Sequence, residues 1–323
     1  MRYKRSTGVW LAGVCASALA LTACGTGSQG EEPNAASYPD GPMTMIVWGT
    51  PGSGTDILGR TLAKALEEPT GESVAVENLE GGGGVQAVNE MMSQPADGQT
   101  ALVVTTSLMA LVARGEVEMP RIVSGAVQGQ SFLVVKPDSP YNTLEEALDY
   151  AKENPGDFKI AGALVGSQAH QLVIELGEEA GVKFSYIPYE GVSDAVTAVL
   201  GGKADMAIGS NAAPQVKSGE LKALSVDTPE RSKIAPDVPT LAELGYDVKA
   251  SLWRAVAVHP DTDEAIVDKL YSHLQEALQS EEFSAYLETQ GEERLDIPQD
   301  EVQQWAEDQL EPTREYLKGI GLL

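Results

Sequence analysis

The stretch MTMIVWGTPGSGTDILGRTLAKALE, residues 43–67, decides the fold class. Its first six residues form an apolar run that predicts a buried strand, and a glycine-rich turn follows. Apolar residues then recur at helical spacing, at Leu58, Leu62, Ala65 and Leu66. A strand, a tight loop and a helix in this order are the repeating unit of a sheet covered by helices.

The same alternation continues along the chain. Further strands are predicted at residues 73–78, 100–104, 131–135, 158–161, 183–187, 204–208, 221–226 and 254–258. Helices are predicted at residues 144–153, 167–179 and 193–200, and through most of the chain after residue 262. This order predicts an α/β protein with mostly parallel sheets, in which ligands bind beyond the carboxyl ends of the strands.

The composition is that of a globular protein and excludes two classes of partner. The chain is 42% hydrophobic, and its 323 residues suggest about two domains. It carries 22 Lys+Arg against 48 Asp+Glu, a net charge of −26. Nucleic-acid binding and electrostatic adhesion to anionic membranes both depend on Lys and Arg, so neither is expected.

The N-terminus predicts export and lipid attachment. Residues 1–23 have a basic start and an apolar run, Val9–Leu21, too short to span a membrane. The run ends in Leu21-Thr22-Ala23-Cys24, which resembles the bacterial lipobox, so Cys24 is predicted to carry lipid on the outer face of the cytoplasmic membrane. An ordinary signal peptide is the alternative. Residues 24–41 then form a flexible tether, and Cys15 leaves with the signal, so no disulfide is expected.

Two strand-to-helix loops predict an anion site. Gly49–Asp56 and Ala161–Gln168 are rich in glycine, which lets backbone N–H groups approach a ligand at a helix N-terminus. The first loop has neither the P-loop lysine nor the dinucleotide pattern, and a plain turn with a helix cap remains the alternative. In the second loop, Ser167 and His170 allow a hydrolase, although a structural His is favoured.

The chemistry-bearing residues give no support for a metal or a cofactor. The three His residues, at 170, 259 and 273, are scattered, and no Cys is free for ligation. Gly81–Gly84 is interpreted as a backbone turn with unusual dihedral angles, or as a close contact between a helix and a strand. We therefore expect neither a metal site nor a bound cofactor.

Seven short motifs occur in an order that resembles one protein family. They are Gly52–Arg60, Val76-Glu77-Asn78 before Gly81, Pro95–Gly98, Gly166-Ser167 with His170, Pro188–Gly191, Gly201–Asp205 and Pro236–Glu243. In this order they resemble the receptors of tripartite tricarboxylate transporters, also called Bug receptors. The chain departs from the family at Trp48-Gly49, where a proline and an aromatic residue are usual, so the far end of the pocket is expected to differ.

The resemblance implies a two-lobed periplasmic-binding-protein fold of type II, in which a small carboxylate binds between the lobes. Residues 42–137 and 254–323 would form the first lobe and residues 138–253 the second. The chain would cross between the lobes near Val135 and again near Trp253.

The resemblance also implies which residues bind. The expected ligand-binding residues are Ser53, Gly54, Thr55, Asp56, Thr105, Thr106, Gly166, Ser167, His170, Ser210 and Asn211. Asp56 would order water, and the loops would clamp the ligand largely through backbone amides and hydroxyls. The implied function is a monomeric receptor, with no chemical step, that delivers its ligand to membrane permease subunits. A sensor that hands the ligand to a signalling partner is the alternative.

Overall fold

The computed structural model describes residues 35–210 and 212–323. The predicted signal peptide, the lipid site at Cys24, most of the tether and Asn211 lie outside these residues.

Two separate sheets organise the described chain. The first has the strand order β11-β4-β10-β3-β1-β2, and the second has the order β7-β6-β8-β5-β9. The strands of the first sheet are β1 (Met43–Trp48), β2 (Val74–Leu79), β3 (Thr100–Thr105), β4 (Arg121–Gln128), β10 (Trp253–Val258) and β11 (Glu293–Arg294). Those of the second are β5 (Phe132–Val135), β6 (Lys159–Gly162), β7 (Ser185–Pro188), β8 (Met206–Gly209) and β9 (Lys222–Val226).

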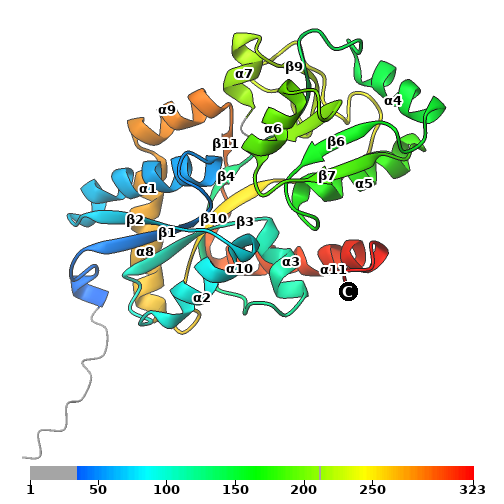
Figure 1. The fold of residues 1–323 in the computed structure, drawn as a ribbon. Helices are drawn as coiled ribbons and strands as arrows, with labels where there is room; N and C mark the ends of the chain where they lie inside the picture. The colour runs from blue at the N-terminus through cyan, green and yellow to red at the C-terminus, as the bar shows by residue number, and fades with distance from the viewer. Residues whose placement is uncertain (1–34, 211) are drawn as a thin grey trace, which may run out of the picture. The chain divides into compact units, whose positions relative to one another are not determined.

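Helices cover both faces of each sheet (Figure 1). The helices associated with the first sheet are α1 (Gly54–Thr70), α2 (Val85–Ser93), α3 (Ser107–Ala113), α8 (Glu264–Leu278), α9 (Glu281–Gln290), α10 (Gln299–Asp308) and α11 (Leu310–Gly319). With the second go α4 (Leu144–Glu153), α5 (Gln168–Ala180), α6 (Val192–Leu200) and α7 (Ala213–Ser218). The short 3₁₀ turns are η1 (Ala35–Ser37) and η2 (Gly82–Gly84).

The sheets are mixed, which corrects the expectation of mostly parallel sheets. In the first sheet β1 runs parallel to β2 and β3, but β10 runs antiparallel to β3 and β4. In the second, β6 runs parallel to β7 and β8, but β5 runs antiparallel to β8 and β9. β10 and β5 are each the first strand that the chain forms after leaving the other sheet, and each enters from the opposite direction. The short edge strand β11 also runs antiparallel to its neighbour, β4.

The first crossing between the sheets lies earlier than predicted. β4 ends at Gln128 in the first sheet and β5 begins at Phe132 in the second, so the boundary falls before Phe132 and not after residue 137. The apolar pattern of residues 131–135 predicts a strand but carries no information on its ladder partners. The return crossing is held beside the first, because the N–H of Gly129 donates to the carbonyl of Leu252 at 2.8 Å. β10 begins directly after it, at Trp253.

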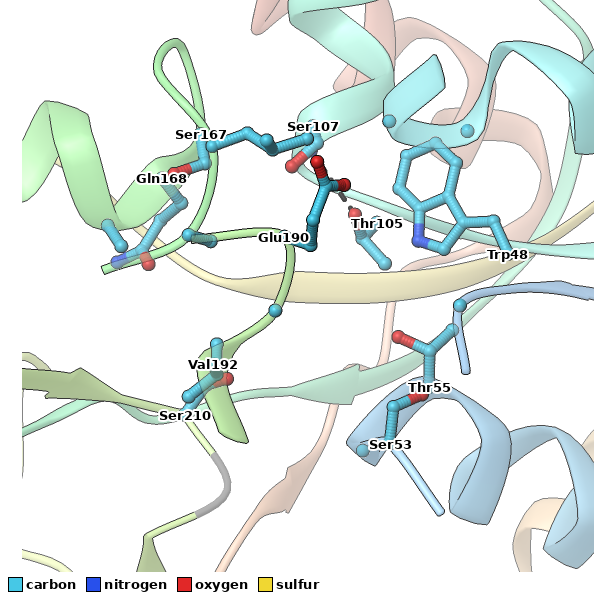
Figure 2. A pocket seen from close by; sticks show the side chains of 18 of the residues that line it. Trp48, Ser53, Thr55, Thr105, Ser107, Ser167, Gln168, Glu190, Val192 and Ser210 are labelled. Carbon is cyan, nitrogen blue, oxygen red and sulfur yellow. Dashed lines mark hydrogen bonds between the residues drawn. The ribbon is translucent and has the colours of Figure 1, made fainter. Parts of the chain in front are cut away.

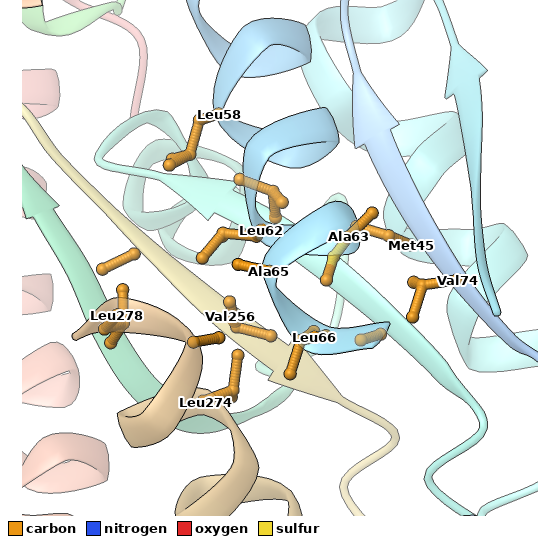
Figure 3. Close-up of a cluster of buried hydrophobic side chains, with 14 of the residues drawn as sticks. Met45, Leu58, Leu62, Ala63, Ala65, Leu66, Val74, Val256, Leu274 and Leu278 are labelled. Carbon is orange, nitrogen blue, oxygen red and sulfur yellow. The ribbon is translucent and has the colours of Figure 1, made fainter. Parts of the chain in front are cut away.

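The largest core cluster holds α1, α8 and α9 against the first sheet. Leu58, Leu62 and Leu66 of α1 are fully buried and meet Val256 and Leu274 (Figure 3). Each buried leucine contributes about 1.5–3 kcal/mol. The helical spacing of these residues thus becomes one apolar face, which fixes the start of α1 above the end of β1.

The cap predicted at Thr143 is confirmed, and the return bond from Glu146 goes to the residue before the cap. The Thr143 hydroxyl accepts from the N–H of Glu146 at 3.3 Å, and the Glu146 carboxylate accepts from the N–H of Asn142 at 2.6 Å. No helix in residues 35–210 and 212–323 is both long enough and apolar enough to cross a membrane.

Candidate functional site

A pocket of about 790 Å³ opens between loops that belong to the two sheets (Figure 2). The loop from β1 to α1 lines it from the first sheet, and the loop from β6 to α5 lines it from the second. Of the predicted binding residues, those that line it are Ser53, Gly54, Thr55, Thr105, Gly166, Ser167 and Ser210. Both glycine-rich loops therefore meet at one cavity.

The N-terminus of α1 presents free backbone donors to this pocket. The Ser53 hydroxyl caps the helix by accepting from the N–H of Asp56 at 3.3 Å. The N–H groups of Gly54 and Thr55 lie in the first turn, where no helical acceptor precedes them. Neither has a hydrogen-bond acceptor within the described chain, and both residues line the pocket.

The N-terminus of α5 repeats this arrangement from the second sheet. The Ser167 hydroxyl accepts from the N–H of His170 at 3.3 Å. The N–H groups of Gln168 and Ala169 find no acceptor among the residues that the structure describes, and both residues line the pocket. Two helix N-termini, each carrying a partial positive charge, thus offer four backbone donors to one cavity, an arrangement suited to an anion.

Asp56 does not line the pocket but holds the first loop in shape. Its carboxylate accepts from the N–H of Gly52 at 2.8 Å, from Nδ2 of Asn78 at 2.8 Å and from Nε of Arg60 at 3.1 Å. Burial alone would raise the pKa of Asp56, but the hydrogen bonds from Arg60, Gly52 and Asn78 outweigh it and lower the pKa. The charged carboxylate is therefore the form that organises the loop.

Asn78 completes the same network and was not predicted to have this role. Its Nδ2 also donates to the carbonyl of Gly49 at 3.2 Å, and its Oδ1 accepts from Arg60 at 2.9 Å. The first two family motifs are thus joined in space through Asp56, Arg60 and Asn78.

His170 does not line the pocket and instead joins the second-sheet loop to the C-terminal helix. Its Nδ1 lies 2.6 Å from the hydroxyl of Tyr316 in α11. The N–H of Gly166 points to the same nitrogen at 3.4 Å, so Nδ1 is the acceptor and Tyr316 donates. Burial lowers the pKa of His170, which favours the neutral ring.

The described residues do not assemble a Ser–His pair. The hydroxyl of Ser167 meets the backbone N–H of His170, and no hydrogen bond joins it to the imidazole in the described part of the chain. No carboxylate orients the ring there either, since the ring contacts Tyr316 and Tyr186. Within residues 35–210 and 212–323, no group of three or more His, Cys, Asp and Glu gathers in a metal-binding arrangement.

Thr105, the last residue of β3, and Thr106, which follows it, have different positions. Thr105 is buried and lines the pocket, where its hydroxyl accepts from the N–H of Ser107 at 3.3 Å. Thr106 does not line it. Its hydroxyl donates to the carbonyl of Ser251 and accepts from the N–H of Trp253, both at 2.9 Å, which ties the end of β3 to the returning crossing.

Several pocket residues were missed by the sequence analysis, and Trp48 is the largest. Its ring lies against Gly84, where an added Cβ would fall 1.6 Å from a ring carbon. Gly84 also has φ +112°, a conformation that side chains rarely adopt. The glycine run is therefore both the unusual turn and the close contact that were expected as alternatives. Other lining residues that were not predicted include Glu80, Ser107, Arg114, Ser131, Gln168, Glu190, Asp194 and Arg254.

A half-buried carboxyl group joins two pocket-lining residues at the first crossing. Asp227 accepts from the N–H of Ser131 at 2.6 Å and from Nε2 of Gln168 at 2.9 Å. Burial raises the pKa of Asp227 to about 7. Because Ser131 and Gln168 both line the pocket, this group links the crossing segment to the first turn of α5.

Comparison with known proteins gives one consistent family. The model of the tripartite tricarboxylate transporter family receptor matches residues 58–322. Protein BugT of Bordetella pertussis strain Tohama I is 34% identical over 294 residues, which cover 84% of this chain and 90% of that protein.

Solved structures agree on the fold. The periplasmic binding protein BugD superposes with a TM-score of 0.80 at 27% identity, covering 88% of this chain and 99% of its own. An R. palustris protein solved with adipate superposes with a TM-score of 0.81 at 24% identity, covering 88% of this chain and 98% of its own.

Proposed function

Because the chain belongs to the tripartite tricarboxylate transporter receptor family, we propose that it is a solute-binding lipoprotein that captures a small carboxylate outside the cytoplasm. It delivers this ligand to the permease subunits of a tripartite tricarboxylate-type transporter. The two-lobed fold is that of a periplasmic binding protein, and such receptors bind between their lobes. The similarity to the protein solved with adipate extends to the fold alone, and the support for a carboxylate ligand comes from the residues of this chain's own pocket.

The observation that carries the proposal is the pair of helix N-termini at one pocket. A carboxylate has two oxygens and needs several donors, and the N–H groups of Gly54, Thr55, Gln168 and Ala169 supply four without any cationic side chain. Two of these belong to each lobe. A ligand that touches both pairs has higher affinity for the closed state and therefore favours lobe closure. Binding and release need no chemical step.

The test removes one backbone donor and leaves the helix intact. Proline is favoured at the first position of a helix, and Ser53 before Gly54 has the extended conformation that a following proline requires. Gly54→Pro should therefore keep α1 but delete one N–H from the pocket. Gly54→Ala is the matched control, since it keeps the N–H.

The assay is a thermal-shift screen of linear and aromatic carboxylates, each paired with its neutral amide. An acid at ~100 times its dissociation constant should stabilise the wild type by about 2.7 kcal/mol. Gly54→Pro should lose about 1.5–3 kcal/mol of binding free energy, and Gly54→Ala should bind nearly normally. Equal stabilisation by the acids and their amides, or normal acid binding by Gly54→Pro, would contradict the clamp.

The lipid anchor is tested separately at Cys24, which the Leu-Thr-Ala-Cys order singles out. Cys24→Ser should move the protein from the membrane fraction to the soluble or secreted fraction. If Cys24→Ser stays in the membrane fraction, the lipobox interpretation is wrong.

A further inference from the structure

The cationic side chains that line the pocket are already neutralised. Among the described lining residues these are Arg114 and Arg254. Arg114 makes two bonds to the Glu116 carboxylate, at 2.7 and 3.2 Å. Arg254 is buried, and its guanidinium donates to Glu292 at 2.7 Å. Each arginine thus has its charge paired with a carboxylate, although Nε of Arg254 is buried and has no hydrogen-bond acceptor in the described part of the chain.

The Arg254 pair is fixed in place, so it cannot easily turn toward a ligand. Arg254 and Glu292 are 3% and 6% exposed, and the hydroxyl of Tyr286 donates to the second Glu292 oxygen at 2.6 Å. Separating a buried pair leaves an uncompensated charge, which is strongly unfavourable.

The acidic side chains that line the pocket have no such compensation. Glu80, Glu190 and Asp194 line it, and within residues 35–210 and 212–323 none of them has a hydrogen bond or an ion pair. Glu190 follows β7, and its side chain extends into the pocket (Figure 2). The charged side chains of the lining are thus net negative in sum, although Glu190 and Asp194 flank the N-terminus of α6, whose partial positive charge offsets part of their charge.

With this charge distribution, the backbone donors and the acidic side chains would contact opposite ends of a ligand. One carboxylate fits the four backbone donors, but a second carboxylate further along the molecule would meet Glu190 and its acidic neighbours. In solvent each such pair at about 4 Å changes affinity roughly fivefold. The net charge of −26 also slows the approach of a polyanion.

We propose that the pocket selects an amino carboxylate, a ligand with one carboxylate at the helix termini and a protonated amine facing Glu190, over dicarboxylates and tricarboxylates. Glu190 is then the residue that determines specificity at the far end. The inference rests on the proposed carboxylate site, and its test is chosen so that the two can fail separately.

The experiment compares ligands of equal length by titration calorimetry at low ionic strength. The probes are 4-aminobutanoate, butanoate and glutarate, with 5-aminopentanoate, pentanoate and adipate as the longer set. Within each set we expect the amino acid to bind at least about tenfold more tightly than the diacid, with the simple acid between them. Added salt should narrow the difference, because Glu190 is exposed to solvent.

Variants at Glu190 assign the effect. Glu190→Gln should weaken binding of the amino acid about fivefold and strengthen binding of the diacid, and Glu190→Lys should reverse the preference. Glu282→Gln, at an exposed position in the first turn of α9, is the control and should change neither affinity.

Each result decides between the proposals. A diacid that binds as tightly as its matched amino acid overturns the selection of an amine and leaves the carboxylate site standing. An unchanged preference in Glu190→Lys overturns the role of Glu190. Butylamine binding as tightly as 4-aminobutanoate, or no binding by any acid in either set, contradicts the carboxylate site itself.

Discussion

Replacement of Asp56 tests whether the first loop is held by its own carboxylate. Asp56→Asn keeps the shape of the side chain but turns one acceptor oxygen into an NH₂ donor. At least one of two donors, the N–H of Gly52 or Nδ2 of Asn78, then loses its acceptor. Asp56 is 3% exposed, so water cannot readily replace the missing partner.

The magnitude follows from these contacts. A buried donor without an acceptor costs about 1–3 kcal/mol. The Arg60 side chain is 53% exposed, so the loss of its ion pair adds at most ~1 kcal/mol. Asp56→Asn should therefore lower the free energy of unfolding by about 1–4 kcal/mol, and Tm by roughly 2–4 °C for each kcal/mol. Asp261→Asn, at an exposed residue, is the matched control and should leave stability unchanged.

The pH dependence gives an independent check. The pKa of Asp56 is lowered in the folded protein, so its contribution is present above about 3.9, the pKa of an unfolded Asp, and is lost as pH falls through the folded value. Urea unfolding at pH 7 and at a series of lower pH values should show the wild type and Asp56→Asn converging in acid. A variant within about 0.5 kcal/mol of the wild type at pH 7 would refute the reasoning.

Three further predictions concern the residues around the pocket. Gly84→Ala should lower the free energy of unfolding by at least about 2 kcal/mol, because the added Cβ meets Trp48. Gly115→Ala is the control: its Cβ would meet nothing within 4 Å, so only the strain of the positive φ should lower its stability. Equal losses for the two variants in urea unfolding would contradict this prediction. Burial raises the pKa of Asp227 to about 7, so the stability that it contributes is full below about pH 4 and is lost as pH rises to about 7. Over that range the free energy of unfolding of the wild type should fall relative to that of Asp227→Asn. Parallel pH profiles of the two proteins in urea unfolding would argue against this. Tyr316→Phe removes the hydrogen bond to His170 and should lower the free energy of unfolding by about 1 kcal/mol, measured by thermal unfolding. Tyr271→Phe on α8 is the control. Equal Tm values for Tyr316→Phe and the wild type would show that the bond contributes nothing.

Much of the local structure was predictable because its cause lies within a few residues of the chain. The apolar run before Gly49 forms β1 over the predicted residues, and the cap at Thr143 opens α4 where expected. β4, α2, α3 and α7 were not predicted. In β4, Ser124 and Gly125 interrupt the apolar pattern, and Gly125 is required because a Cβ there would fall 2.4 Å from the Leu295 carbonyl. Leu295 is distant from Gly125 in the sequence, so no local pattern predicts this contact.

The sequence by itself determined two glycine-rich loops at helix N-termini, and with them a chemistry suited to an anion, because helix capping and backbone freedom are local properties. Only the tertiary structure decided which side chains surround that anion. In the folded chain Asp56 pairs with Arg60 and His170 pairs with Tyr316, and neither Asp56 nor His170 lines the pocket. Trp48 and Glu190 line it instead. His170 and Tyr316 are 146 positions apart, and such partners meet only when the two sheets and their helices have packed.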